Sequence, residues 1–103
     1  MIDLGAEAAA THAPRAGLEP LGSDVLIEGT IRSATATEIV VVTPSLLPAG
    51  SRAFIVIDAP GDLPIVGLVE VTDQHVLLDD VAVELHLLVI RMSDENLARL
   101  SRV

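Results

Sequence analysis

The sequence predicts an all-β domain that ends in a short C-terminal helix. Between residues 25 and 92, apolar segments of strand length follow one another and are separated by turn-forming residues. Hydrophobic residues make up 50% of the chain, yet Phe54 is its only aromatic residue, so the core must consist of Val, Ile, Leu and Ala. A chain of 103 residues ordinarily forms one domain, and we place it at 23–103.

Residues 1–22 are predicted to be a flexible arm outside this domain. They are rich in alanine, Pro14 and Pro20 interrupt regular structure, and no apolar face is long enough to be buried. The first ten residues carry acids where a secretory leader needs bases. No segment approaches the roughly 18 uninterrupted apolar residues of a membrane span. We therefore expect a cytoplasmic protein without a membrane span.

The first three strands are predicted from hydrophobic alternation. Residues 25–31 form the first strand, and after a polar stretch the Val-rich segment 38–43 returns as its hairpin partner. Residues 44–50 hold two prolines and a glycine, and they form a loop because proline cannot donate to a sheet ladder. Residues 51–58 are the third strand.

The rest of the chain is predicted to add further strands. Residues 65–72 form the fourth strand, and Gly67 in its interior indicates a bulge or a barrel corner. A short segment at 76–78 and a turn at 79–80 precede the longest strand, 81–90. Because side chains alternate along a strand, the odd-numbered residues of 81–90 form the core face.

A short helix is predicted to start at Ser93. Ser93 can accept a hydrogen bond from a first-turn amide, the acids at 94 and 95 complement the positive end of the helix, and the arginines at 99 and 102 complement its negative end. A helix this short is marginal alone, so its apolar stripe must dock on the sheet or on another subunit. The stripe consists of Leu97, Leu100 and Val103.

Charge and composition exclude several functions. The formal net charge of -9 repels phosphate backbones, so we expect no binding of DNA or RNA, although a small anion in a groove stays possible. The chain has no cysteine, which excludes disulfides, thiolate catalysis and Cys-bound zinc. All six basic residues are arginine. Arginine offers a planar fork for phosphate or guanine, although a GC-rich genome would produce the same bias.

The titratable residues indicate neither a metal site nor an enzyme. Asp73, His75 and the two acids at 79–80 surround a predicted turn, but acidic turns are ordinarily solvated and this spacing matches no known metal loop. Glu84 and His86 share the outer face of a strand and could support acid–base chemistry. No nucleophile or second base is placed to complete such a site, so we expect a surface pair.

The order of elements carries a family resemblance. The segments on which it rests are, in chain order, 29–41, 47–50, 51–57, 65–69, 83–87 and the terminal helix. This order resembles that of a PilZ domain, and the resemblance covers residues 25–103. It implies a small six-stranded antiparallel β-barrel with a C-terminal helix. It also implies a role in bacterial signalling, because many PilZ domains bind the second messenger cyclic di-GMP.

The resemblance also implies where a ligand would bind. In the family, a (Asp/Asn)-x-Ser-x-x-Gly turn after the first strand contacts cyclic di-GMP. Here Ser33 takes the position of the acid or amide, Thr35 that of the serine and Glu38 that of the glycine. Only the Thr35 hydroxyl is close to the family residue. Glu38 adds a side chain and a negative charge where the family has bare backbone near the ligand.

The second part of the family site is an Arg-x-x-x-Arg arm ahead of the first strand. Arg15 is the one candidate here, because Thr11 then stands at the position of the other arginine. Arg15 can equally be a solvated residue of the arm, and Arg32 can substitute by reaching over the turn. Losing one arginine of a pair on a dianion could cost a few kcal/mol, out of roughly 8 kcal/mol for micromolar binding. The implied ligand residues are Arg15, Arg32, Ser33 and Thr35.

Two functional hypotheses follow. The first is an atypical PilZ-like signalling domain that needs no cofactor, binds cyclic di-GMP weakly or not at all, and acts by binding a protein partner or by self-association. The second is a genuine cyclic di-GMP receptor with an atypical site. A third interpretation, independent of the resemblance, is a generic β-barrel domain of a larger assembly. Neither an enzyme nor a nucleic-acid binder fits the sequence.

Overall fold

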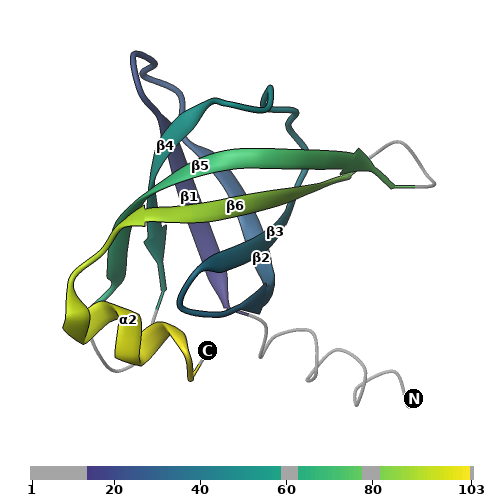
Figure 1. The fold of residues 1–103 in the computed structure, drawn as a ribbon. Helices are drawn as coiled ribbons and strands as arrows, with labels where there is room; N and C mark the ends of the chain where they lie inside the picture. Colours follow the sequence, from purple (N-terminus) through teal and green to yellow (C-terminus); the bar gives the residue numbers. More distant parts are fainter. Residues whose placement is uncertain (1–13, 59–62, 78–81, 103) are drawn as a thin grey trace, which may run out of the picture.

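The fold is a closed β-barrel, seen in a computed structural model that describes residues 14–58, 63–77 and 82–102. Within these residues, six antiparallel strands form the barrel and a short helix follows them (Figure 1). The strand order is β1-β2-β3-β6-β5-β4, and β4 pairs with β1 to close the barrel. The predicted fold class is therefore confirmed. The elements are β1 (Arg15–Pro20), β2 (Ile27–Ala34), β3 (Glu38–Thr43), β4 (Arg52–Ile57), β5 (Ile65–Val76), β6 (Val83–Arg91) and α2 (Asp94–Leu100).

Strand β1 corrects the prediction of a flexible arm over residues 1–22. It pairs with β2 on one side and with β4 on the other, so it is part of the barrel. Its inward side chains Ala16 and Leu18 are buried in the core. The sequence pattern missed it because a six-residue strand with only two inward apolar side chains has too little alternation to stand out. Residues 1–13 of the predicted arm lie outside the described residues.

Strand β5 corrects a second prediction. The polar residues at 73–75 were expected to separate a strand at 65–72 from a short one at 76–78, but they continue a single strand of 12 residues. Asp73, Gln74 and His75 pair in register with His86, Leu85 and Glu84 of β6. Polar side chains are tolerated there because this part of the strand is largely exposed. β5, and not β6, is thus the longest described strand.

The core consists of aliphatic side chains that point into the barrel. On β6, Val83, Leu85 and Leu87 are buried, as the alternation predicted, and Val89 is partly buried against them. Phe54 lies on the outside, so the described core contains no aromatic residue. Fully buried members from the other strands include Leu18, Ile39, Val41, Ile55, Ile57, Ile65 and Val69.

Helix α2 begins where the sequence predicts. Ser93 caps it, because the Ser93 hydroxyl accepts a hydrogen bond from the Asn96 amide at 3.2 Å. Leu100 is fully buried in the core cluster and Leu97 is half-buried, so this part of the predicted stripe docks on the barrel, while Val103 lies outside the described residues. The Asn96 side chain donates to the Val66 carbonyl, so the helix lies beside the start of β5 (Figure 1). Among the described residues, no helix has the length and apolar character needed to cross a bilayer.

Candidate functional site

Arg15, the predicted arm residue, lies at the start of β1. It pairs with Thr30 in register, and its Nη2 atom lies 3.9 Å from Glu28 Oε1. Both side chains of this ion pair are more than two thirds exposed, and such surface pairs contribute little to stability. Arg15 is therefore directed toward the start of β2 and away from the β2–β3 turn.

Arg32, Ser33 and Thr35 share the β2–β3 hairpin. Arg32 is the extra residue of a β-bulge, because the pairing of β2 with β3 shifts register between Ile31 and Ser33. The Thr35 hydroxyl accepts hydrogen bonds from the amides of Glu38 and Thr37, at 3.0 and 3.3 Å. Thr35 therefore shapes the turn itself. Three of the four predicted ligand residues lie on this hairpin, while Arg15 lies on the neighbouring strand β1, opposite Thr30, and its side chain pairs with Glu28.

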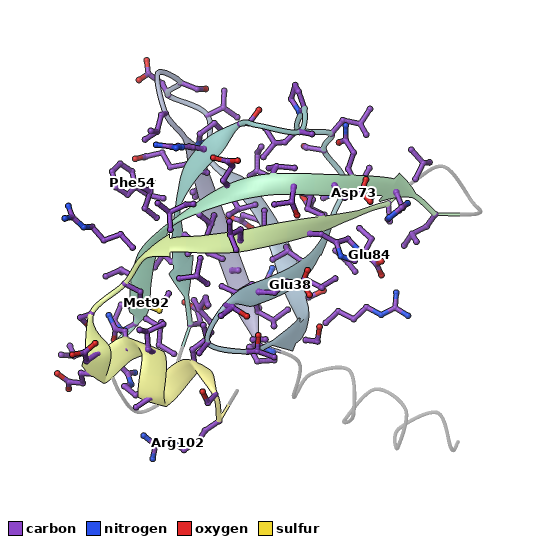
Figure 2. All side chains as sticks on the ribbon, in the orientation of Figure 1. Glu38, Phe54, Asp73, Glu84, Met92 and Arg102 are labelled. Carbon is purple, nitrogen blue, oxygen red and sulfur yellow. The ribbon has the colours of Figure 1, made fainter. Side chains whose placement is uncertain are left out.

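The Arg32 guanidinium reaches across β3 to β6. Its Nη1 atom forms an ion pair with Glu84 Oε2, and the other carboxylate oxygen of Glu84 accepts a hydrogen bond from His86 Nε2 at 3.0 Å. His86 Nδ1 lies 3.9 Å from Glu38 Oε2. These four residues, Arg32, Glu38, Glu84 and His86, form the polar cluster on the outer face of the barrel. Figure 2 labels two of them, Glu38 and Glu84.

The polar cluster keeps the Glu84 carboxyl ionised. The hydrogen bond from His86 lowers the pKa of Glu84, partial burial acts in the opposite direction, and the charge of Arg32 lowers it again, so the net shift is downward. A carboxylate with a lowered pKa is a weak base. The predicted outward pairing of Glu84 with His86 is confirmed. Its link to Arg32 was missed, because it depends on the bulge, which no sequence pattern indicated.

A second histidine lies beside the polar cluster. The ring of His75 meets the ring of His86 edge-on, with centroids 5.3 Å apart, and His75 Nε2 lies 3.2 Å from Asp73 Oδ2. Within residues 14–58, 63–77 and 82–102, no three His, Asp or Glu side chains are arranged to hold a metal ion. The acids at 79–80, which the sequence placed near His75, lie outside the described residues.

An apolar groove lies on the outer face of β4 and β5. Phe54, Val56 and Val66 are 50%, 40% and 47% exposed, although side chains on the outer face of a barrel strand are usually polar. The groove encloses about 450 Å³, and Leu68 and Met92 complete its lining. Figure 2 labels Phe54 and Met92. Cross-strand pairing joins Phe54 to Leu68 and Val56 to Val66, so these side chains form one continuous surface. These five residues define the apolar groove.

Gly67 allows this groove to form. A Cβ atom at this position would lie 2.7 Å from Met92 Cε and 2.9 Å from the Arg91 carbonyl oxygen. The absence of a side chain therefore lets the end of β6 and Met92 lie directly against β5. The pairing of β5 with β6 shifts register between Leu68 and Val69, but the extra residue is Ile90 of β6, so the bulge lies opposite the predicted position at Gly67 and not in β5 itself.

A second hollow adjoins the apolar groove over β1. It encloses about 420 Å³, and Val56 lines both hollows. Its charged lining consists of two carboxylates, Glu28 and Asp58, and one guanidinium, Arg15, and the rest of its lining is apolar. We name this hollow the acidic cleft and define it by Arg15, Glu28, Val56 and Asp58. The Asp58 amide donates to the Arg15 carbonyl at 2.9 Å, which fixes Asp58 beside the start of β1.

Sequence reasoning missed both hollows, although one signal was present. The segments 53–57 and 65–69 are apolar almost without interruption, which in an antiparallel strand means apolar side chains on both faces.

The chain matches no protein-family model, and no curated protein sequence is similar enough to count as a relative. The functional conclusions below therefore rest on the residues and their geometry.

Proposed function

We propose that this protein is an atypical PilZ-like signalling domain of the cytoplasm, without catalytic activity, that binds a protein partner through the apolar groove. The observation that carries the proposal is the exposure of Phe54, Val56 and Val66 side by side on β4 and β5. Contiguous exposed apolar surface usually marks an interaction site, because leaving it in water costs free energy.

The surroundings of the predicted ligand residues favour weak or absent binding of cyclic di-GMP. Arg15 and Arg32 each face a carboxylate of this chain, Glu28 and Glu84. An anionic nucleotide would have to displace these carboxylates and also approach Glu38, which lies 3.9 Å from His86. Each of these charges opposes a dianion. The two arginines are also engaged with carboxylates on different strands, Arg15 with β2 and Arg32 with β6, which does not favour a shared clamp on one ligand.

The alternative is a genuine cyclic di-GMP receptor. One observation favours it: Arg32, Ser33 and Thr35, which the resemblance assigns to the ligand, share one hairpin. Isothermal titration of the full chain with cyclic di-GMP separates the two hypotheses. We expect no heat of binding at tens of micromolar ligand. Low-micromolar binding that disappears in Arg32→Ala or Arg15→Ala would establish the receptor instead.

The groove itself is tested with two valine-to-threonine substitutions on the same strand. Val66→Thr places a hydroxyl in the groove, whereas Val76→Thr makes the same change at the other end of β5, where the side chain is 54% exposed. Both keep the β-branched shape that strands favour. Proteins captured by the wild-type chain are compared with those captured by each variant. We expect partner binding to fall in Val66→Thr and to persist in Val76→Thr.

The expected loss can be estimated from the exposed surface. Burying a whole valine side chain contributes at least roughly 1.5 kcal/mol, and about half of Val66 remains to be buried, so its change to threonine should weaken binding about threefold to tenfold. Circular dichroism first establishes that both variants are folded. Equal capture by both variants, or no protein that distinguishes them, would overturn the proposal.

A further inference from the structure

The apolar groove and the acidic cleft form one continuous surface. Register pairing places Gly17, Val56 and Val66 in one row across β1, β4 and β5. Asp58 follows Val56 by two residues, and its amide still bonds to β1, so the chain remains extended there. Residues two apart on an extended chain are about 7 Å apart and point to the same side. A partner that covers Val56 and Val66 therefore reaches the Asp58 carboxylate with its neighbouring residue.

The charge at this end of the surface is negative. Glu28 and Asp58 outnumber Arg15, and the 3.9 Å pair between Arg15 and Glu28 is exposed enough to exchange partners. Asp58 forms no ion pair with any described residue, and Glu19, which pairs in register with Phe54, adds another carboxylate beside the groove. A cation placed in the acidic cleft would therefore meet two carboxylates. Among the described residues only one of them, Glu28, already has an ion-pair partner, Arg15.

The opposite end of the groove carries a positive charge. Arg91 pairs in register with Leu68 and is the basic residue that lines the groove on the β6 side. Only β5 lies between β6 and β4, so two strand spacings of together about 10 Å separate Arg91 from β4. The surface is thus apolar in the middle, acidic toward β1 and basic at Arg91. A bound segment would be oriented by this difference in charge.

We infer that the partner presents an arginine or lysine beside its apolar anchor, and that Glu28 and Asp58 bind this residue in the acidic cleft. The inference rests on the proposed function of the apolar groove and identifies the chemistry of its partner. The chain's formal charge of -9 also attracts a basic segment over a distance, whereas it opposes docking of a second copy and of anionic nucleic acid or lipid.

The test begins with a defined probe. A phage-displayed library of random dodecapeptides is selected on the full chain and then depleted on the Val56→Thr/Val66→Thr variant, so that only peptides that need the groove are kept. We expect these peptides to share an apolar pair with an arginine or lysine within four residues. One of them is synthesised, together with a version in which citrulline replaces arginine or glutamine replaces lysine. Affinities are measured by fluorescence anisotropy.

Substitution of Asp58 then locates the contact. Asp58→Asn should weaken binding of the basic peptide about fivefold, as expected for a partly exposed charge pair. It should leave the affinity for the neutral peptide unchanged. Asp73→Asn makes the same charge change on the distant part of β5, and it should leave both affinities unchanged. The weakening by Asp58→Asn should also diminish as salt is added, because screening reduces exposed charge interactions.

Three outcomes overturn the inference, and they are distinguishable. If the selected peptides need the groove but carry no basic residue, or if Asp58→Asn does not change their affinity, the inference of a basic partner is wrong and the proposed function still stands. If the selection yields no peptide whose binding depends on the groove, both the basic partner and the proposed function of the groove are wrong. Sedimentation of the wild-type chain as a dimer that Val66→Thr dissociates would show that a second copy covers the groove, and the basic partner would then be excluded.

Discussion

Substitution of Gly67 by alanine tests the close approach of β5 to the end of β6. A Cβ atom at this position would lie 2.7 Å from Met92 Cε and 2.9 Å from the Arg91 carbonyl oxygen, where ordinary contacts begin at 3.4 Å. The overlaps are therefore about 0.7 and 0.5 Å. The Met92 methyl group can turn away, but the Arg91 carbonyl belongs to the backbone and can move only with the strand.

The expected loss of stability combines two opposing effects. Overpacking of this kind typically costs roughly 1–3 kcal/mol, while replacing glycine by alanine restricts the unfolded chain and returns roughly 0.4–1 kcal/mol. We expect Gly67→Ala to lower the free energy of unfolding by about 1–2 kcal/mol. With a typical dependence on urea for a chain of this size, the unfolding midpoint falls by roughly 0.5–1 M.

Gly17→Ala is the matched control on β1. The atom nearest to its new Cβ, at 3.1 Å, is the tip of the exposed Leu26 side chain, which can move aside. Gly17→Ala should therefore match or exceed the wild-type stability. Unfolding is followed by far-ultraviolet circular dichroism, because the chain contains neither tryptophan nor tyrosine. The cost of Gly67→Ala should persist in a Met92→Ala background, since the Arg91 carbonyl remains. A wild-type midpoint for Gly67→Ala would refute the reasoning.

Three further predictions concern other parts of the barrel. Leu18→Ala should lower the free energy of unfolding by roughly 2–5 kcal/mol in a urea titration, because it opens a cavity in the core, whereas a residue of a flexible arm would show no effect. Ser93→Ala removes the cap of α2 and should cost about 1 kcal/mol, measured in the same way. The pKa of Glu84 is lowered in the folded state, so its carboxylate stabilises the fold above its unfolded pKa and loses that contribution as pH falls through the folded value. The difference in urea midpoint between wild type and Glu84→Gln should thus be greatest near neutral pH and vanish in acid.

The sequence predicts most of the strands because their alternation is local. Strand β3 was predicted with its observed bounds, and the Ser93 cap of the helix was also predicted correctly. Strand β1 was not, because it has only Ala16 and Leu18 to place in the core and depends on pairing with β2 and β4. The pairing with β4 joins residues that are distant in the sequence, and no local pattern encodes it.

The contacts of the candidate site likewise include some that the sequence predicts and some that it does not. The outward pairing of Glu84 with His86 follows from two-residue periodicity, and so it was predicted. The contact of Arg32 with Glu84 spans three strands and depends on a bulge, so it required the three-dimensional arrangement. The apolar groove was detectable in principle, since Phe54 and Val66 belong to segments that are apolar on both faces. Which of the two faces stays uncovered was decided only by how the barrel closes.

The position of β1 between β2 and β4 has a consequence for how the chain is made. As the protein leaves the ribosome, β1 can form a hairpin with β2 early, but its other edge has no partner until Ile57 has been synthesised. Until then the nascent chain exposes unpaired strand edges, which are the usual starting points for aggregation and strand exchange. A fragment that lacks β1 would keep such edges permanently, on both β2 and β4. Fusion tags and truncations that disturb residues 15–20 should therefore reduce the yield of monomer more than changes elsewhere on the surface.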